Sequence, residues 1–248
     1  MLKIILSPAK KMVVDTDSLE TVSLPPFLDK TETIKNELQS KTYAELKKLW
    51  VCNDKIAEEN VQRLENMNLN RNITPAILAY DGIAFKYMAP AVFDNSQFEY
   101  IQNHLFILSG FYGVVRPFDG VVPYRLEMQA KLKIDDKKNL YEYWGSDLYD
   151  FVTKDTDTII NLASEEYSKT ISKYLSDDVK FITITFADLI DGKLVEKGTK
   201  CKMARGEMVR FMAENNIENP EEIKKFNRLN YEFSPRHTTG TNIVFIQK

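Results

Sequence analysis

Val179-Lys-Phe-Ile-Thr-Ile-Thr-Phe186 is the strongest strand signal in the sequence, because β-branched and aromatic residues alternate along it. A turn at Asp191-Gly192 follows and leads to Leu194–Val195, which predicts a hairpin partner for this strand. Short apolar runs elsewhere predict further buried strands at Leu2–Leu6, Leu105–Leu108, Thr158–Leu162 and Asn242–Ile246. The fold is therefore expected to be built on a sheet.

Helical patterns lie between the expected strands. Apolar spacing and capping residues predict helices around residues 28–39, 42–50, 54–66, 94–104, 140–152, 165–175 and 201–215. Ala76–Tyr80 fits either a short buried strand or the first turn of a helix. Strands and helices mix along the whole chain, and no linker is long or polar enough to separate two domains. We predict a single α/β domain of mixed α+β character over residues 1–248, with a mixed sheet covered by helices.

The composition excludes several classes of protein. The 248 residues include 33 Lys and Arg and 36 Asp and Glu, a net charge of −3, so nucleic-acid binding would need a local basic face. Cys52 and Cys201 lie far apart, and His104 and His237 are the only histidines, so we expect no disulfide scaffold, metal site or cofactor. No apolar run approaches the roughly 18 residues of a membrane span, and the apolar start is too short for a signal peptide. We expect a cytoplasmic protein that does not bind membranes.

The densest candidate for a binding site is the stretch Leu108-Ser-Gly-Phe-Tyr-Gly-Val-Val-Arg-Pro-Phe-Asp119. Gly110 and Gly113 could turn backbone amides toward an anion, and Arg116 and the nearby Arg125 could add positive charge. The glycine pattern is similar to the hairpin of helix-hairpin-helix DNA-binding modules, although it is one residue longer. The alternative is a tight turn after a strand, in which Arg–Glu pairs brace the loops.

The helix expected from Cys201 is the second candidate. Lys202, Arg205 and Arg210 lie opposite its apolar side, with Gly206 between them. A basic stripe beside a glycine suits phosphate contact, because the backbone can come close and the cations can displace counterions. The alternative is an ordinary solvated helix face.

Two polar groups at the expected sheet are further candidates. Ser7 and Lys10 lie in the loop that leaves the first strand, and ligands of open α/β sheets gather at the carboxyl ends of strands. Asn161 interrupts an otherwise apolar strand, where a buried amide needs hydrogen-bond partners. The alternative for Lys10 is a solvent-exposed lysine on a strand-end turn.

Five segments together resemble the YaaA family of bacterial peroxide stress proteins, in the family's order and spacing. They are SPAK (7–10), LSGFYGVVRPFDGVVPYRLEM (108–128), LYEYWG (140–145), INLASEEYSK (160–169) and KMARGEMVRFM (202–212). The resemblance implies a cytoplasmic protein that helps the cell survive hydrogen peroxide by limiting damage from unincorporated iron. It also implies a single α/β fold with a positively charged cleft and a helix-hairpin-helix-like element that binds duplex DNA.

Carried onto this sequence, the resemblance places the hairpin at Ser109–Gly113 and assigns the cleft cations to Lys10, Arg116, Arg125, Lys202 and Arg205. Two functional classes follow from these residues. In the first, the glycine-loop amides and the basic side chains bind the phosphates of duplex DNA. In the second, an enzyme acts on a small phosphorylated or nucleotide-like molecule, an anionic ligand bound in a pocket that is lined by Ser7, Lys10, Arg116, Arg125, Asn161 and Lys202.

Overall fold

The computed structural model describes residues 1–248, and its main feature is one eight-stranded sheet in the order β4-β3-β1-β6-β7-β10-β9, with β8 paired to β7. The strands are β1 Lys3–Leu6, β3 Leu105–Ser109, β4 Gly113–Val115, β6 Thr158–Leu162, β7 Lys180–Ile190, β8 Lys193–Val195, β9 Tyr231–Phe233 and β10 Asn242–Gln247. The five strands β3, β1, β6, β7 and β10 run parallel, whereas β4, β8 and β9 are antiparallel to their neighbours. The predicted mixed sheet and the predicted β7–β8 hairpin are confirmed.

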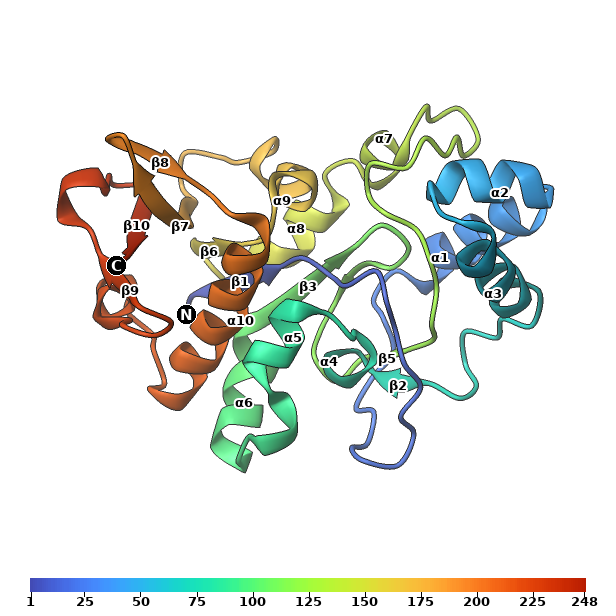
Figure 1. The fold of residues 1–248 in the computed structure, drawn as a ribbon. Coiled ribbons are helices and arrows are strands. Elements are labelled where there is room, and N and C mark those ends of the chain that lie inside the picture. The colour runs from blue at the N-terminus through green and yellow to red at the C-terminus, as the bar shows by residue number, and fades with distance from the viewer.

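The helices lie on both sides of this sheet. They are α1 Leu28–Gln39, α2 Tyr43–Trp50, α3 Asp54–Glu65, α4 Ala76–Ala79, α5 Ile83–Met88, α6 Asn95–His104, α7 Leu140–Trp144, α8 Asp147–Thr153, α9 Glu165–Ser172 and α10 Gly198–Glu214. Figure 1 shows α5, α6 and α10 in front of the sheet, α8 and α9 behind it, and α1–α3 together at one end of the molecule. A short second sheet joins β2 (Thr74–Pro75) to β5 (Gly120–Val121).

Local sequence explains most helix boundaries. Thr42 and Asp94 begin α2 and α6 with capping boxes, in which the side chain and the third helical residue satisfy each other's backbone amides. The helix predicted over 140–152 is wrong in one respect, because Gly145 takes a φ of +55° and divides it into α7 and α8. The segment that follows Pro220 is a 3₁₀ helix, Pro220–Lys225.

A single cluster of 62 buried hydrophobic residues forms the core. The central strand β1 lies between β3 and β6, with Ile5 paired to Phe106 on one side and to Asn161 on the other, and its apolar residues are fully buried. Burial of a side chain of this size stabilises the fold by about 1.5–3 kcal/mol. None of the helices is both long enough and apolar enough to cross a membrane.

Candidate functional site

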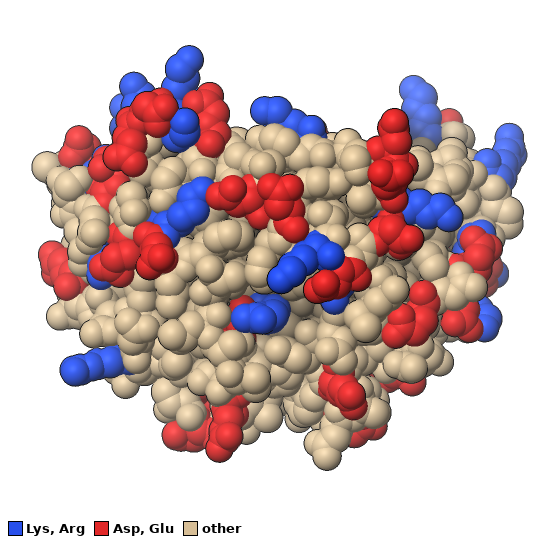
Figure 2. Space-filling model, turned by 180° about the vertical axis from the view of Figure 1, so that it is seen from behind, with Lys and Arg blue, Asp and Glu red and all other residues tan.

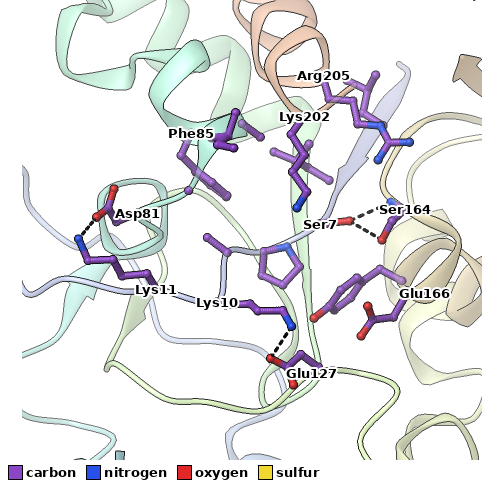
Figure 3. A pocket seen from close by; sticks show the side chains of 18 of the residues that line it. Ser7, Lys10, Lys11, Asp81, Phe85, Glu127, Ser164, Glu166, Lys202 and Arg205 are labelled. Carbon is purple, nitrogen blue, oxygen red and sulfur yellow. Dashed lines mark hydrogen bonds and ion pairs between the residues drawn. The ribbon is translucent and has the colours of Figure 1, made fainter. Parts of the chain in front are cut away.

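A cavity of about 390 Å³ opens where β1 and β6 end. The chain leaves β1 toward β3 on one side and later returns to place β6 on the other side, so this edge is a topological switch point, where α/β sheets bind ligands. The polar residues that line the cavity are Ser7, Lys10, Lys11, Asp81, Tyr124, Arg125, Glu127, Ser164, Glu166, Tyr167, Lys202 and Arg205 (Figure 3). Of the six pocket residues predicted from sequence, Ser7, Lys10, Arg125 and Lys202 therefore meet here.

The two strand-end loops are tied together at the centre of the cavity. The Ser164 amide donates to Ser7 Oγ at 2.9 Å, and the two hydroxyl oxygens lie 3.2 Å apart. Gly82 lets the Ser7–Lys10 loop approach α5, since a Cβ at that position would lie 2.6 Å from the Ala9 Cβ. The loop that was expected at a strand end is therefore held on both sides.

Glycine packing places α10 over the cavity. A Cβ on Gly206 would lie 1.9 Å from the carbonyl oxygen of Ala84, so only glycine lets α10 approach α5 this closely. Lys202 and Arg205 precede Gly206 on the same helix and line the cavity. The interpretation of Gly206 as a phosphate-contact residue is corrected, because this residue is buried and its close neighbour is a backbone. The apolar side expected for this helix is buried as predicted.

The glycine-rich segment Ser109–Gly113 connects the antiparallel strands β3 and β4 and is buried throughout. A Cβ on Gly110 would lie 2.7 Å from the carbonyl oxygen of Leu126, and Gly113 takes a φ of +74° beside the ring of Trp144. Ser109 Oγ accepts the backbone amides of residues 111 and 112 at 3.1 and 2.9 Å. Ser109 and Gly110 therefore brace the 124–128 loop from inside, Gly113 packs against α7 and α8, and none of the three lines the cavity.

A buried chain of hydroxyl groups supports the same loop. Tyr124 lines the cavity, and its hydroxyl oxygen lies 2.6 Å from Ser109 Oγ and 3.0 Å from the hydroxyl oxygen of Tyr80. Burial raises the pKa of Tyr124 to about 12, so its hydroxyl stays protonated and available for these hydrogen bonds. These hydrogen bonds hold Tyr124 in place at the start of the loop that carries Arg125 and Glu127.

Glu127 holds two of the cavity's cations. Its Oε1 lies 3.1 Å from Lys10 Nζ and 3.2 Å from Arg125 Nη2. The Glu127 and Arg125 side chains are only 11% and 12% exposed, whereas Lys10 is 65% exposed. The expected Arg–Glu pair is present, and it fixes the side of the cavity on which Arg125 lies.

Three cations at this site are paired incompletely or not at all. Arg125 Nε and Arg205 Nε are buried and have no hydrogen-bond acceptor. Arg205 reaches Glu196 only through its terminal nitrogen, at 3.6 Å. Lys202 is exposed at the cavity and forms no ion pair. A buried donor without an acceptor costs about 1–3 kcal/mol, so the two Nε atoms are unfavourably placed, whereas Lys202 is the cavity cation without a counter-charge in the protein.

Sequence analysis missed two acidic residues of the cavity, Asp81 and Glu166. Asp81 pairs with Lys11 and Lys86, which lowers the pKa of its carboxyl. Glu166 forms no ion pair, and burial raises the pKa of its carboxyl, helped by the negative charge of Glu127. The order of the strands could have revealed Glu166, since residues after β6 must meet those after β1 if the two strands are parallel neighbours.

Two predicted pocket residues lie elsewhere. Arg116 binds the fully buried Asp119, with its Nη2 3.1 Å from Oδ1 and its backbone amide 2.8 Å from Oδ2. Asn161 donates to Thr183 Oγ1 at 3.2 Å and accepts the Ala163 amide at 2.9 Å, so its amide is satisfied inside the sheet. Both side chains have structural roles, and neither lines the cavity.

Positive charge is in excess among the residues that line the cavity. Five cations and three carboxylates line it, an excess of two positive charges in a chain whose net charge is −3. Figure 2 shows one face of the molecule, on which Lys and Arg lie singly among Asp and Glu. No group of three or more His, Cys, Asp or Glu side chains is arranged to hold a metal ion.

The fold and the cavity define an α/β protein with a pocket at a topological switch point, lined by more cations than carboxylates. The family model described as "Peroxide stress protein YaaA" matches residues 2–237. A UPF0246 protein of Agathobacter rectalis is 62% identical over 247 residues, which cover 100% of this chain and 99% of the relative. UPF0246 proteins of Desulfitobacterium hafniense and Pediococcus pentosaceus are 53% and 50% identical, over 99% of this chain and 98% of each relative. The chain belongs to the YaaA family of peroxide stress proteins.

Proposed function

We propose that this protein binds a small phosphorylated, nucleotide-like molecule in the cavity between β1, β6 and α10, as its part in the peroxide stress response. One observation carries the proposal: Arg125, Arg205 and Lys202 line one cavity, and Lys202 has no ion-pair partner within the protein. Phosphate oxygens form strong, charge-assisted hydrogen bonds with guanidinium and ammonium groups. The ligand class agrees with the mixed lining of the cavity, in which 9 of 21 residues are hydrophobic.

Calorimetric titration with AMP and with inorganic phosphate tests this proposal. Lys202→Ala should weaken both affinities by about tenfold to a hundredfold, since a hydrogen bond to a charged group contributes about 1.5–3 kcal/mol. Lys48→Ala is the matched control, because Lys48 is exposed on α2 and forms no ion pair. Binding that is absent, or that the two variants weaken equally, would refute a phosphate site in the cavity.

Duplex DNA is the second candidate ligand. Lys10 and Lys11 line the cavity, Lys86 shares the partner Asp81 with Lys11, and the three side chains are 65%, 72% and 67% exposed, so they could reach backbone phosphates. Three phosphate contacts predict a log–log slope of affinity against salt of about −3. Fluorescence anisotropy of a labelled duplex over a salt series measures this slope. A Lys10→Ala/Lys11→Ala variant should lower the slope by about two, and an unchanged slope would exclude these lysines from a DNA interface.

Limiting damage from unincorporated iron is the third part of the proposed role, suggested by the family resemblance. A bacterial strain that lacks the gene should regain peroxide survival, and lose excess iron signal in whole-cell electron paramagnetic resonance, when it expresses the wild type. Lys202→Ala should restore neither property if the cavity serves this role. Full complementation by Lys202→Ala would separate the cavity from the peroxide response.

A further inference from the structure

We propose that the phosphorylated ligand also carries an amino or amidine nitrogen, and that Glu166, supported by Glu127, binds this nitrogen at the opposite end of the cavity from the phosphate. This inference rests on the proposed function. Figure 3 shows Lys202 and Arg205 at one end of the cavity, Glu127, Glu166 and Lys10 at the other, and the Ser7–Ser164 pair between them. Both carboxylates lie at the end away from Lys202, where Lys10 and Arg125 pair with Glu127.

Glu166 has unused acceptor capacity. Its Oε1 accepts only the Gln129 amide, at 3.2 Å, and no cation lies within ion-pair distance of the carboxylate. Glu127 differs, because Lys10 and Arg125 already neutralise it. A carboxylate in a partly buried site is stabilised by a charged or polar donor, and of the three cavity carboxylates only Glu166 has no cation as an ion-pair partner.

Electrostatics at Glu166 favours the same conclusion. Burial raises the pKa of the Glu166 carboxyl, and the charge of Glu127 raises it further. The Gln129 amide lowers this pKa, and the positive charges of Lys10 and Lys169 lower it to a smaller extent. The ionised form is thus under-compensated in the free protein, and an incoming nitrogen donor would supply what is missing.

Tyr167 provides a second, independent group at this end. It lines the cavity, it is 6% exposed, and its hydroxyl donates no hydrogen bond within the protein. Many nitrogen heterocycles also carry a ring nitrogen that accepts hydrogen bonds, and this nitrogen could accept one from the Tyr167 hydroxyl. Pro8, Phe85 and Leu126 also line the cavity, so the body of the ligand would meet apolar side chains.

The test compares two pairs of probes that differ in the nitrogen alone. The pairs are AMP against purine riboside 5′-monophosphate, and phosphoethanolamine against ethyl phosphate. Calorimetry on the full chain should show that the amino member of at least one pair binds about tenfold more tightly. Glu166→Gln should reduce this preference to about twofold while the Lys202-dependent binding of the member without an amino group persists.

Glu165→Gln is the matched control, because Glu165 is exposed on the same helical turn, carries the same charge and does not line the cavity. It should leave the preference unchanged. Lys202-dependent phosphate binding without an amino preference in either pair would overturn the inference and leave the proposed function standing. A preference that survives Glu166→Gln would overturn the assignment to Glu166. No Lys202-dependent binding of any probe would overturn both.

Discussion

Replacing Gly206 with alanine tests the contact that positions α10 over the cavity. The new Cβ would lie 1.9 Å from the carbonyl oxygen of Ala84, 2.7 Å from its carbonyl carbon and 3.0 Å from its Cα. Non-bonded carbon atoms prefer about 3.5–4.0 Å, so the two helices must separate by more than about 1 Å. All three neighbouring atoms belong to the backbone of α5, and rotation of a side chain therefore cannot relieve the overlap.

The expected cost follows from these distances. Overpacking of a tight core usually costs about 1–3 kcal/mol, and contact with a fixed backbone places this site at the upper end or beyond it. Alanine gains about 1 kcal/mol over glycine in a helix interior, which offsets part of the cost. We expect a net loss of about 2 kcal/mol, which corresponds to a Tm lower by about 4–8 °C in a chain of this size.

Thermal unfolding by circular dichroism measures this shift, with Gly198→Ala as the matched control. Gly198 is the first residue of the same helix, and a Cβ there would meet nothing within 4 Å. Gly198→Ala should leave the Tm unchanged or raise it slightly. Phosphate affinity should fall in Gly206→Ala as well, because Lys202 and Arg205 move with the helix. Equal Tm values for the two alanine variants would refute the account of how α10 is positioned.

Three further predictions concern other sites. Asp119→Ala leaves the Arg116 guanidinium and amide without their buried acceptor, so urea unfolding should show a loss of about 2–3 kcal/mol, and wild-type stability would contradict this role. The pKa of Glu166 is raised above its ordinary value of 4.5, so the wild type loses stability as pH rises through this pKa. Glu166→Gln should therefore unfold at a higher temperature than the wild type near neutral pH, and this gain should vanish below about pH 4.5. A gain that does not depend on pH would show that ionisation of Glu166 is not its cause. Burial and the charge of Glu196 raise the pKa of the Cys201 thiol, so iodoacetamide should alkylate the half-buried Cys52 at least about tenfold faster until the chain is unfolded, and equal rates in the folded protein would contradict the burial.

Much of the fold could be predicted from local sequence. The alternation of residues 179–186 predicts β7, and the side chains of Thr42 and Asp94 begin the helices that their patterns indicate. These signals are local, because backbone hydrogen bonds, capping and side-chain alternation involve residues only a few positions apart. The division at Gly145 escaped prediction, since a glycine within a helical pattern is compatible with either a continuous or a broken helix.

The role of each glycine was the weakest part of the prediction of the site. Gly110 and Gly206 were expected to approach a phosphate, and in the structure each is required by close backbone contact with another segment. A sequence shows that the Cβ is missing, but it does not show which neighbour occupies that space. Arg116 was misplaced for a related reason, since its partner Asp119 is three residues away and satisfies it locally.

The sequence by itself determined the mixed α/β class, most strands and helices, and a set of cations that includes Lys10, Arg125, Lys202 and Arg205. Only the tertiary structure decided that these cations meet Ser7 and Glu166 in one cavity. The order of the parallel strands brings the ends of β1 and β6 together, and glycine packing brings α10 above them. Both features depend on contacts between residues more than a hundred positions apart, and no local pattern encodes which distant segments share an edge of the sheet.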